Sequence, residues 1–150
     1  MTAGSFALEH LERQRYLDAN GAVPGDCWRT CVAGMVGFAR DEVPHFIHEF
    51  PGDAAQWWHA TVAWIEERFA GMTLACLAPD AFPVYDGEPL FPLVIATGPS
   101  PRGDWLHSVL VDWRTGDLVW DPHPTGVGLA GPVVDVAAMA STHAAQDVAP

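Results

Sequence analysis

Residues 105–124 read WLHSVLVDWRTGDLVWDPHP. Two runs of β-branched and aromatic residues flank the short sequence RTG at 114–116, a pattern typical of two antiparallel strands joined by a tight turn. With a three-residue loop and its glycine in the left-handed conformation, Trp113 pairs with Asp117. The sequence therefore predicts a β-hairpin in this part of the chain.

The hairpin register decides which side chains meet. In the predicted register Asp121 is a diagonal neighbour of His107, with backbones on the order of 7 to 8 Å apart, within reach of a side-chain hydrogen bond. A two-residue loop would instead turn Asp121 to the other face of the hairpin, because successive side chains alternate between faces. We expect the first register, and with it a His107–Asp121 pair.

The rest of the chain predicts helices first and strands second. Helical spacing of apolar residues, with N-cap and glycine signals, favours helices over 5–20, 27–38, 41–50 and 54–71. Strand-like runs occupy 72–78 and 92–97 before the hairpin, and a short helix is expected at VVDVAAMAS, residues 133–141. This order predicts one α+β domain over 1–150, in which helices pack on an antiparallel sheet.

Composition narrows the possible partners. The 150 residues include 19 Asp and Glu against 7 Lys and Arg, for a formal net charge of -12. Such a surface repels polyanions, so neither nucleic acid nor an anionic membrane is expected as a partner, and a neutral or cationic substrate fits better. No apolar run has the length of a membrane span, and the acidic N-terminal stretch does not resemble a signal peptide. We expect a cytoplasmic protein without a cofactor.

The three cysteines, Cys27, Cys31 and Cys76, suggest a reactive thiol. An odd number argues against a disulfide framework. Asp26 is a good N-cap residue, which places Cys27 in the first turn of a helix, where the backbone dipoles and free N–H groups stabilise a thiolate. Cys31 lies one turn further from that positive end, and we interpret it as a packing residue.

A cysteine nucleophile needs a base, and the base needs a group that orients it. His107 and Asp121 meet those needs in the predicted hairpin. The hypothesis is that His107 deprotonates Cys27, that Asp121 orients the imidazole, and that the thiolate attacks a carbonyl to form an acyl-enzyme. His123 is a second candidate for the orienting group, although the prolines around it favour a turn.

A cysteine at a helix start, then a histidine opening a strand, then an aspartate ending the next strand, resembles the papain-like cysteine peptidase superfamily. The Asp26-Cys27-x-x-x-Cys31 segment, His107 and Asp121-Pro122 look like the peptidases that process double-glycine leader peptides. The hairpin is also similar to that of transglutaminase-like proteins. A set of short uncharacterised bacterial and phage proteins is similar over GDCWRTCVAG, DEVPHF and DPHPTG.

This resemblance implies a papain-like fold, with the nucleophile helix packed on a C-terminal antiparallel sheet, and a cysteine peptidase or amidase acting on a peptide or protein substrate. Such enzymes usually present a glutamine shortly before the nucleophile to stabilise the oxyanion. In this sequence Asn20 and the more distant Gln14 are the candidates. Trp28 follows the nucleophile where the family often has glycine, although the backbone N–H of Cys27 or Trp28 can still contribute a donor.

Three other interpretations stay open. A transglutaminase-like protein would transfer the acyl group to an amine, and a silent module would keep the papain-like fold only to bind a partner. The third interpretation is a zinc site, since four residues are of types that bind zinc: Cys27, Cys31, His107 and His123. The paired CxxC-like motifs of strong structural zinc sites are absent from the sequence.

We expect packing roles for several histidines and tryptophans on the predicted helices. Three of these histidines lie among aromatic and acidic residues, and we interpret them as surface or packing residues: His45, His48 and His59. Three indoles are expected in the core, or along a substrate groove: Trp57, Trp58 and Trp64.

Overall fold

The computed structural model describes residues 10–79 and 91–142 and has an α+β architecture. Its five strands form one antiparallel sheet in the order β1-β5-β2-β3-β4. The strands are β1 (Met72–Leu77), β2 (Leu93–Pro99), β3 (Leu106–Asp112), β4 (Leu118–Trp120) and β5 (Asp135–Ser141). The helices are α2 (Cys27–Val36), η1 (Arg40–Glu42), α3 (Phe46–Glu49) and α4 (Ala54–Arg68).

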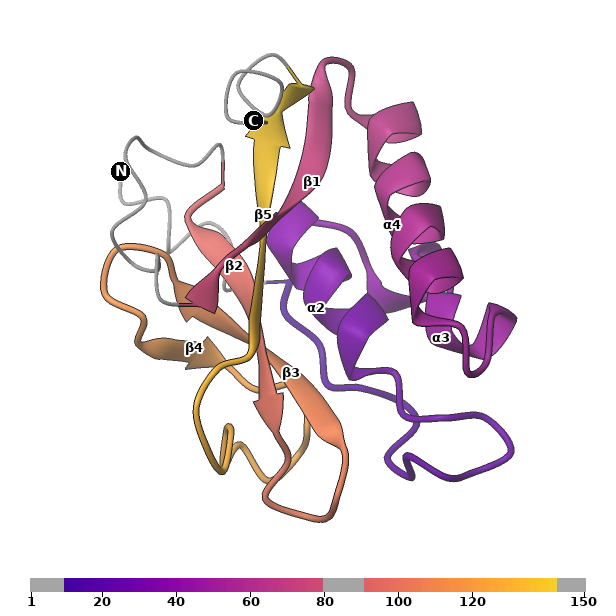
Figure 1. Ribbon diagram of the computed structural model, residues 1–150, viewed down its shortest axis with the longest axis vertical. Helices are drawn as coiled ribbons and strands as arrows, with labels where there is room; N and C mark the ends of the chain where they lie inside the picture. Colours follow the sequence, from indigo (N-terminus) through magenta and orange to yellow (C-terminus); the bar gives the residue numbers. More distant parts are fainter. Residues whose placement is uncertain (1–9, 80–90, 143–150) are drawn as a thin grey trace.

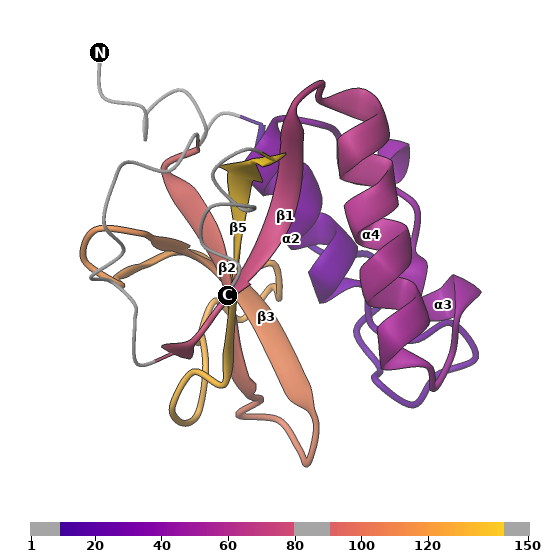
Figure 2. The same ribbon diagram turned by 45° about the horizontal axis from the view of Figure 1, so that its top comes forward.

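The helices gather on one side of the sheet, as Figures 1 and 2 show. Helix α2 packs against β3 and β2, α4 packs against β1, and α3 packs against α4. The main core lies between these layers and contains fully buried residues from both, among them Cys31, Val32, Ile65, Ile95 and Leu110. This packing places the N-terminal end of α2 next to the start of β3.

Helix α2 begins at Cys27, as the sequence predicts, and ends earlier than expected. Gly37 takes a left-handed conformation (φ 87°) and its N–H bonds to the carbonyl oxygen of Ala33, which closes the helix before Phe38. The helix expected over 41–50 is divided into η1 and α3, and the one expected over 54–71 ends at Arg68. The α+β class and the antiparallel sheet are confirmed.

The helix expected over 5–20 is wrong for the described residues 10–20, which contain no helix. This N-terminal segment instead lies along the chain that follows β4. The N–H of Gln14 donates to the carbonyl oxygen of Pro122 at 2.8 Å, and Trp120 Nε1 donates to the carbonyl oxygen of Glu12 at 2.9 Å. Hydrogen bonding with a distant segment overrides the moderate helical spacing of the sequence.

The helix expected over residues 133–141 is also wrong, because this segment forms strand β5 in the interior of the sheet, between β1 and β2. Strand β5 pairs with β1 on one side and with β2 on the other. Its central residues, 136–140, are all buried, so the strand shows a continuous apolar run without polar alternation. The alanines of that run favour a helix by propensity, and burial between two strands outweighs this preference.

The β3–β4 hairpin reaches the predicted register by an unexpected route. Its loop contains four residues instead of three, because Asp112 pairs with Asp117 and Val111 pairs with Leu118. A β-bulge then shifts the register by one residue, so that Leu110 pairs with Trp120. Beyond the bulge the register is the one that places Asp121 diagonally opposite His107.

No helix within residues 10–79 and 91–142 is long and apolar enough to cross a membrane.

Candidate active site

Cys27 is the first residue of α2 and is partly exposed. The carbonyl oxygen of Asp26 accepts hydrogen bonds from the N–H and the hydroxyl of Thr30, so Asp26 occupies the N-cap position. Its carboxylate makes no capping bond, contrary to the usual role of an N-cap aspartate. The Asp26 carboxylate therefore does not neutralise the first backbone N–H groups of the helix, and their partial positive charge lies next to Cys27.

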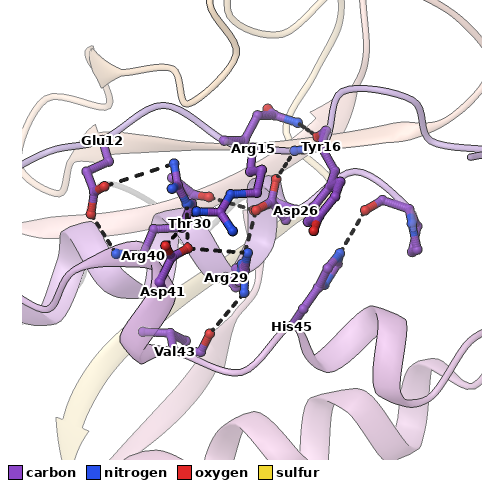
Figure 3. Close-up of polar contacts among 12 residues, drawn as sticks. Glu12, Arg15, Tyr16, Asp26, Arg29, Thr30, Arg40, Asp41, Val43 and His45 are labelled. Atoms are coloured by element: carbon purple, nitrogen blue, oxygen red, sulfur yellow. Dashed lines mark hydrogen bonds and ion pairs between the residues drawn. The ribbon is translucent and has the colours of Figure 1, made fainter. Parts of the chain in front are cut away.

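The Asp26 carboxylate is fully buried and fastens the N-terminal segment to α2, as Figure 3 shows. One oxygen accepts the N–H of Tyr16 at 2.8 Å, and the other accepts Arg29 Nε at 3.0 Å. Neighbouring contacts extend this network: the N–H of Arg40 donates to Glu12 at 2.7 Å, and Arg15 pairs with the exposed Asp41 at 2.6 Å. Asp26 thus holds residues 14–16 beside the nucleophile candidate.

His107 and Asp121 form a buried pair. Nε2 of His107 lies 2.6 Å from Oδ1 of Asp121, and each residue is only 3% exposed. Three further N–H groups support Asp121, since its carboxylate accepts bonds from His123 N–H at 2.9 Å and Gly128 N–H at 2.8 Å, and its carbonyl oxygen accepts Arg13 Nη1 at 2.6 Å. The carboxylate is therefore fixed in position before any substrate binds.

The thiol of Cys27 lies beside the same imidazole, since both residues line the smaller hollow and the thiol is one of the groups that raise the pKa of His107. Burial alone would lower the pKa of His107, but hydrogen bonds with Asp121 and with Cys27 outweigh it and raise the pKa to about 9. Because Asp121 occupies Nε2, Nδ1 is the nitrogen left for the thiol. Burial tends to raise the pKa of Asp121, whereas the hydrogen bond from His107 and the two backbone N–H groups lower it below the usual value. The structure thus brings all three predicted residues together.

The other two cysteines have different surroundings. Cys31 is fully buried in the main core, and burial, followed by the proximity of Cys27 and Asp121, raises the pKa of its thiol. Cys76 is exposed on β1, and its Sγ donates to Asp135 at 3.9 Å. Burial is the main cause of a raised pKa at Cys76 as well, followed by the charge of Asp135. Among the described residues, Cys27 is thus the cysteine whose thiol contacts an imidazole.

The two candidates for an oxyanion-stabilising side chain are placed differently. Gln14 is buried, and it lines the same hollow as Cys27 and His107. Its Nε2 donates to the carbonyl oxygen of Tyr16 at 2.7 Å, which leaves one amide hydrogen unused. Asn20 lies in a turn and does not line that hollow. Gln14 is therefore the candidate that the fold brings to the site.

Two hollows meet at Cys27. A larger one of about 520 Å³ extends between the helices and the sheet, and a smaller one of about 150 Å³ extends toward His107, His123 and Gln14. Cys27, Ile47 and Leu106 line both hollows, so they form the boundary between them. A reacting group bound at the sulfur thus has room on both sides.

His123 lies near His107 without replacing Asp121. The two rings are 6.3 Å apart and nearly perpendicular, and His123 Nδ1 accepts the N–H of Thr125 at 3.1 Å. Burial, followed by the charge of Arg102, lowers the pKa of His123. Among the residues that the structure describes, no group of three or more His, Cys, Asp or Glu has the arrangement of a metal site.

The other histidines and indoles singled out by the sequence divide between packing and the larger hollow. His45 is buried, binds the carbonyl oxygen of Pro24 through Nε2 at 2.7 Å and stacks on Tyr16. Trp64 lies in the core, whereas Trp57, Trp58 and His59 line the larger hollow. The expectation of a groove bordered by indoles thus matches two of the three tryptophans named for it.

Comparison of the chain with protein-family models, with curated proteins and with solved structures returns no match. Function is therefore inferred from the geometry of the site.

Sequence reasoning missed the residues that support the pair from outside the hairpin. Arg13 bonds to the carbonyl oxygen of Asp121 and stacks over the ring of Trp120 at 3.9 Å. The N–H of Gly128 reaches the Asp121 carboxylate from a loop seven residues away. The first contact depends on how the tertiary fold places a distant segment, and the second depends on the path of an irregular loop, so neither has a local sequence pattern. Gly128 takes a conformation that residues other than glycine rarely adopt (φ 83°), which explains why glycine stands at this position.

Proposed function

We propose that this protein is a cysteine-dependent hydrolase of the papain-like kind, a peptidase or amidase that uses Cys27 as nucleophile, His107 as base and Asp121 as orienting group. The observation that carries the proposal is the order of three side chains: the Cys27 thiol lies beside the His107 ring, and Nε2 of that ring lies 2.6 Å from Oδ1 of Asp121. A nucleophile, a base and an orienting group in hydrogen-bond sequence are the arrangement that acyl transfer requires.

In the reactive form the proton of the Cys27 thiol already lies on Nδ1 of His107, in keeping with the raised pKa of this ring, and the sulfur attacks the substrate carbonyl carbon. As the tetrahedral intermediate collapses, the C–N bond breaks and the amine leaves with the proton that His107 returns to it. A thioester then joins the acyl group to Cys27. Water attacks this thioester, gives a proton to His107, and releases the acid and the free thiol.

The oxyanion formed in both steps needs donors near the sulfur. The backbone N–H of Cys27 at the helix N-terminus supplies one. The unused amide hydrogen of Gln14 supplies the second, since Gln14 borders the same hollow as Cys27. The network around Asp26 supports this role, because it fixes Tyr16 two residues beyond Gln14.

Selective alkylation of thiols tests the proposal. In a Cys76→Ser background, which removes the exposed thiol, iodoacetamide at pH 5.5 should label Cys27 rapidly, because an ordinary thiol is almost wholly protonated there. Cys27→Ala should abolish labelling, and Cys31→Ala, the matched control in the same helix, should preserve it. Equal loss of labelling from both variants, or a rate no faster than that of free cysteine, would contradict the assignment.

The acceptor of the acyl group is tested separately. Peptide amides incubated with the protein should yield the free acid. A transglutaminase-like protein would form a transamidated product when a primary amine is added, and a silent binding module would form neither product. Mass spectrometry of the reaction distinguishes the three results.

A further inference from the structure

The larger hollow, which we call the apolar cleft, is lined by described residues of α2, α3, α4 and four strands. Most of them are apolar or aromatic, and they include Trp28, whose ring lies 5.1 Å from that of Trp57 and 6.0 Å from that of Trp58. The volume of the apolar cleft, about 520 Å³, lies within the range of small-molecule sites, about 300 to 1,000 Å³. The cleft is large enough for a bulky side chain together with the chain that carries it.

One carboxylate interrupts this apolar lining. Asp135, the first residue of β5, is the acidic residue among the described lining residues, and it is exposed. Its one hydrogen-bond partner from the described chain is the weak donor Cys76, and no arginine of the described residues pairs with it. A carboxylate beside apolar surface and without a cation is suited to receive a positive charge from a ligand.

The position of His107 decides which part of a substrate enters the cleft. His107 returns the proton to the leaving amine, so the leaving group must lie on the His107 side of Cys27. His107 lines the smaller hollow and does not line the apolar cleft. The acyl part of the substrate must then lie on the opposite side of the sulfur, in the cleft.

We propose that the acyl part of the substrate carries a bulky apolar side chain next to the reacting carbonyl and a positively charged group beyond it, which pairs with Asp135. This inference rests on the proposed function for its assignment of the two sides. The binding of such a group to the apolar cleft does not depend on the proposed function. The net charge of -12 favours the approach of the same class of ligand.

A set of matched coumarin amides tests the charge. Free Gly-Phe, acetyl-Gly-Phe and succinyl-Gly-Phe coumarin amides present an ammonium, no charge and a carboxylate at one position, when assayed at pH 6. The wild-type protein should prefer the ammonium over the acetyl compound in kcat/KM by about fivefold, the upper size of the effect of an exposed ion pair. The succinyl compound should be the poorest of the three.

Two variants locate the preference. Asp135→Asn should remove it, and Asp117→Asn, which deletes an equal charge in the β3–β4 turn, should preserve it. Replacing phenylalanine by alanine in the substrate should lower kcat/KM on the order of tenfold or more, because the burial of an aromatic ring is lost. A preference that is absent, or that survives Asp135→Asn, overturns the inference.

A binding measurement separates this inference from the proposed function. Gly-Phe-amide should bind to the Cys27→Ala variant and change the fluorescence of Trp57 and Trp58, and Asp135→Asn should weaken that binding. Binding with this dependence, in a protein that hydrolyses none of the amides, supports the cleft assignment and contradicts the hydrolase. Absence of Asp135-dependent binding overturns the cleft assignment whether or not hydrolysis is seen.

Discussion

The His107–Asp121 pair should make the stability of the fold depend on pH in a defined direction. The pKa of His107 is about 9 in the folded protein, above the value of about 6.5 for an unfolded chain. A raised folded pKa stabilises the fold fully below pH 6.5, and this contribution is lost as pH rises through 9. The lowered pKa of Asp121 acts at the acid end, where stability is lost as pH falls below about 4.

The size of the effect follows from the two pKa values. At pH 5 the pair contributes roughly 3 kcal/mol to the free energy of unfolding through the proton on His107, and at pH 8 only about 1.4 kcal/mol of this remains. We expect Asp121→Asn to remove the part of this contribution that Asp121 supplies, because burial then lowers the pKa of His107 and only Cys27 opposes it. The difference between wild type and variant should therefore shrink from pH 5 to pH 8, by about 2 kcal/mol at most.

Urea unfolding of both proteins at pH 5, 6, 7 and 8 measures this difference. The change at His45, whose pKa is lowered, opposes the slope in both proteins and largely cancels on subtraction. The change at His123 does not cancel, because the charge of Asp121 raises the pKa of His123 and the variant removes that charge. Asp117→Asn serves as the control for the loss of one carboxylate and should run parallel to the wild type. Parallel curves for wild type and Asp121→Asn, or an NMR titration that places the pKa of His107 near 6.5, would refute the reasoning.

Three further substitutions test the packing that holds the site. Gly34→Ala should lower the free energy of unfolding by up to about 2 kcal/mol, since its Cβ would lie 2.7 Å from Leu11 Cδ2 and 2.8 Å from Leu110 Cδ1, and this overpacking outweighs the gain in helix propensity; a variant more stable than the wild type in thermal unfolding would contradict this reasoning. Met139→Ala should cost about 2 to 5 kcal/mol in urea unfolding, as expected for a side chain only 2% exposed, and a cost below about 1 kcal/mol would contradict its burial. Asp26→Asn should cost roughly 1 to 3 kcal/mol and slow the alkylation of Cys27, because Arg29 loses its buried acceptor. The exposed Asp41→Asn is its control and should cost less than about 1 kcal/mol.

The hairpin shows how far local pattern could predict the site. The turn sequence and the β-branched runs predicted the antiparallel strands, and Gly116 takes the left-handed conformation expected of it (φ 77°). The predicted loop was one residue too short, and the β-bulge in β4 offset that error before the chain reached Asp121. A bulge has no reliable local signature, so the correct pairing depended on two opposite deviations.

The failures share one physical cause. Residues 10–20 and β5 are held by partners far along the chain, and a single sequence does not specify which distant strand or carbonyl a segment will meet. The position of Cys27 at a helix start was predictable, because glycine, aspartate and the apolar spacing that follows are local signals. The buried role of Asp26 was not, because its partner Tyr16 comes from a segment that helical spacing misassigned.

The interior position of β5, between β1 and β2, also constrains the order in which the molecule can be completed. Strand β1 has β5 as its neighbour in the sheet, so it cannot join the other strands until residues 135–141 have been synthesised. Contacts between segments more than fifty residues apart form slowly, because a long loop must close first. On the ribosome, the wall of the cleft that contains Asp135 is then assembled last, and the nascent chain has a thiol before it has a finished binding surface for a substrate.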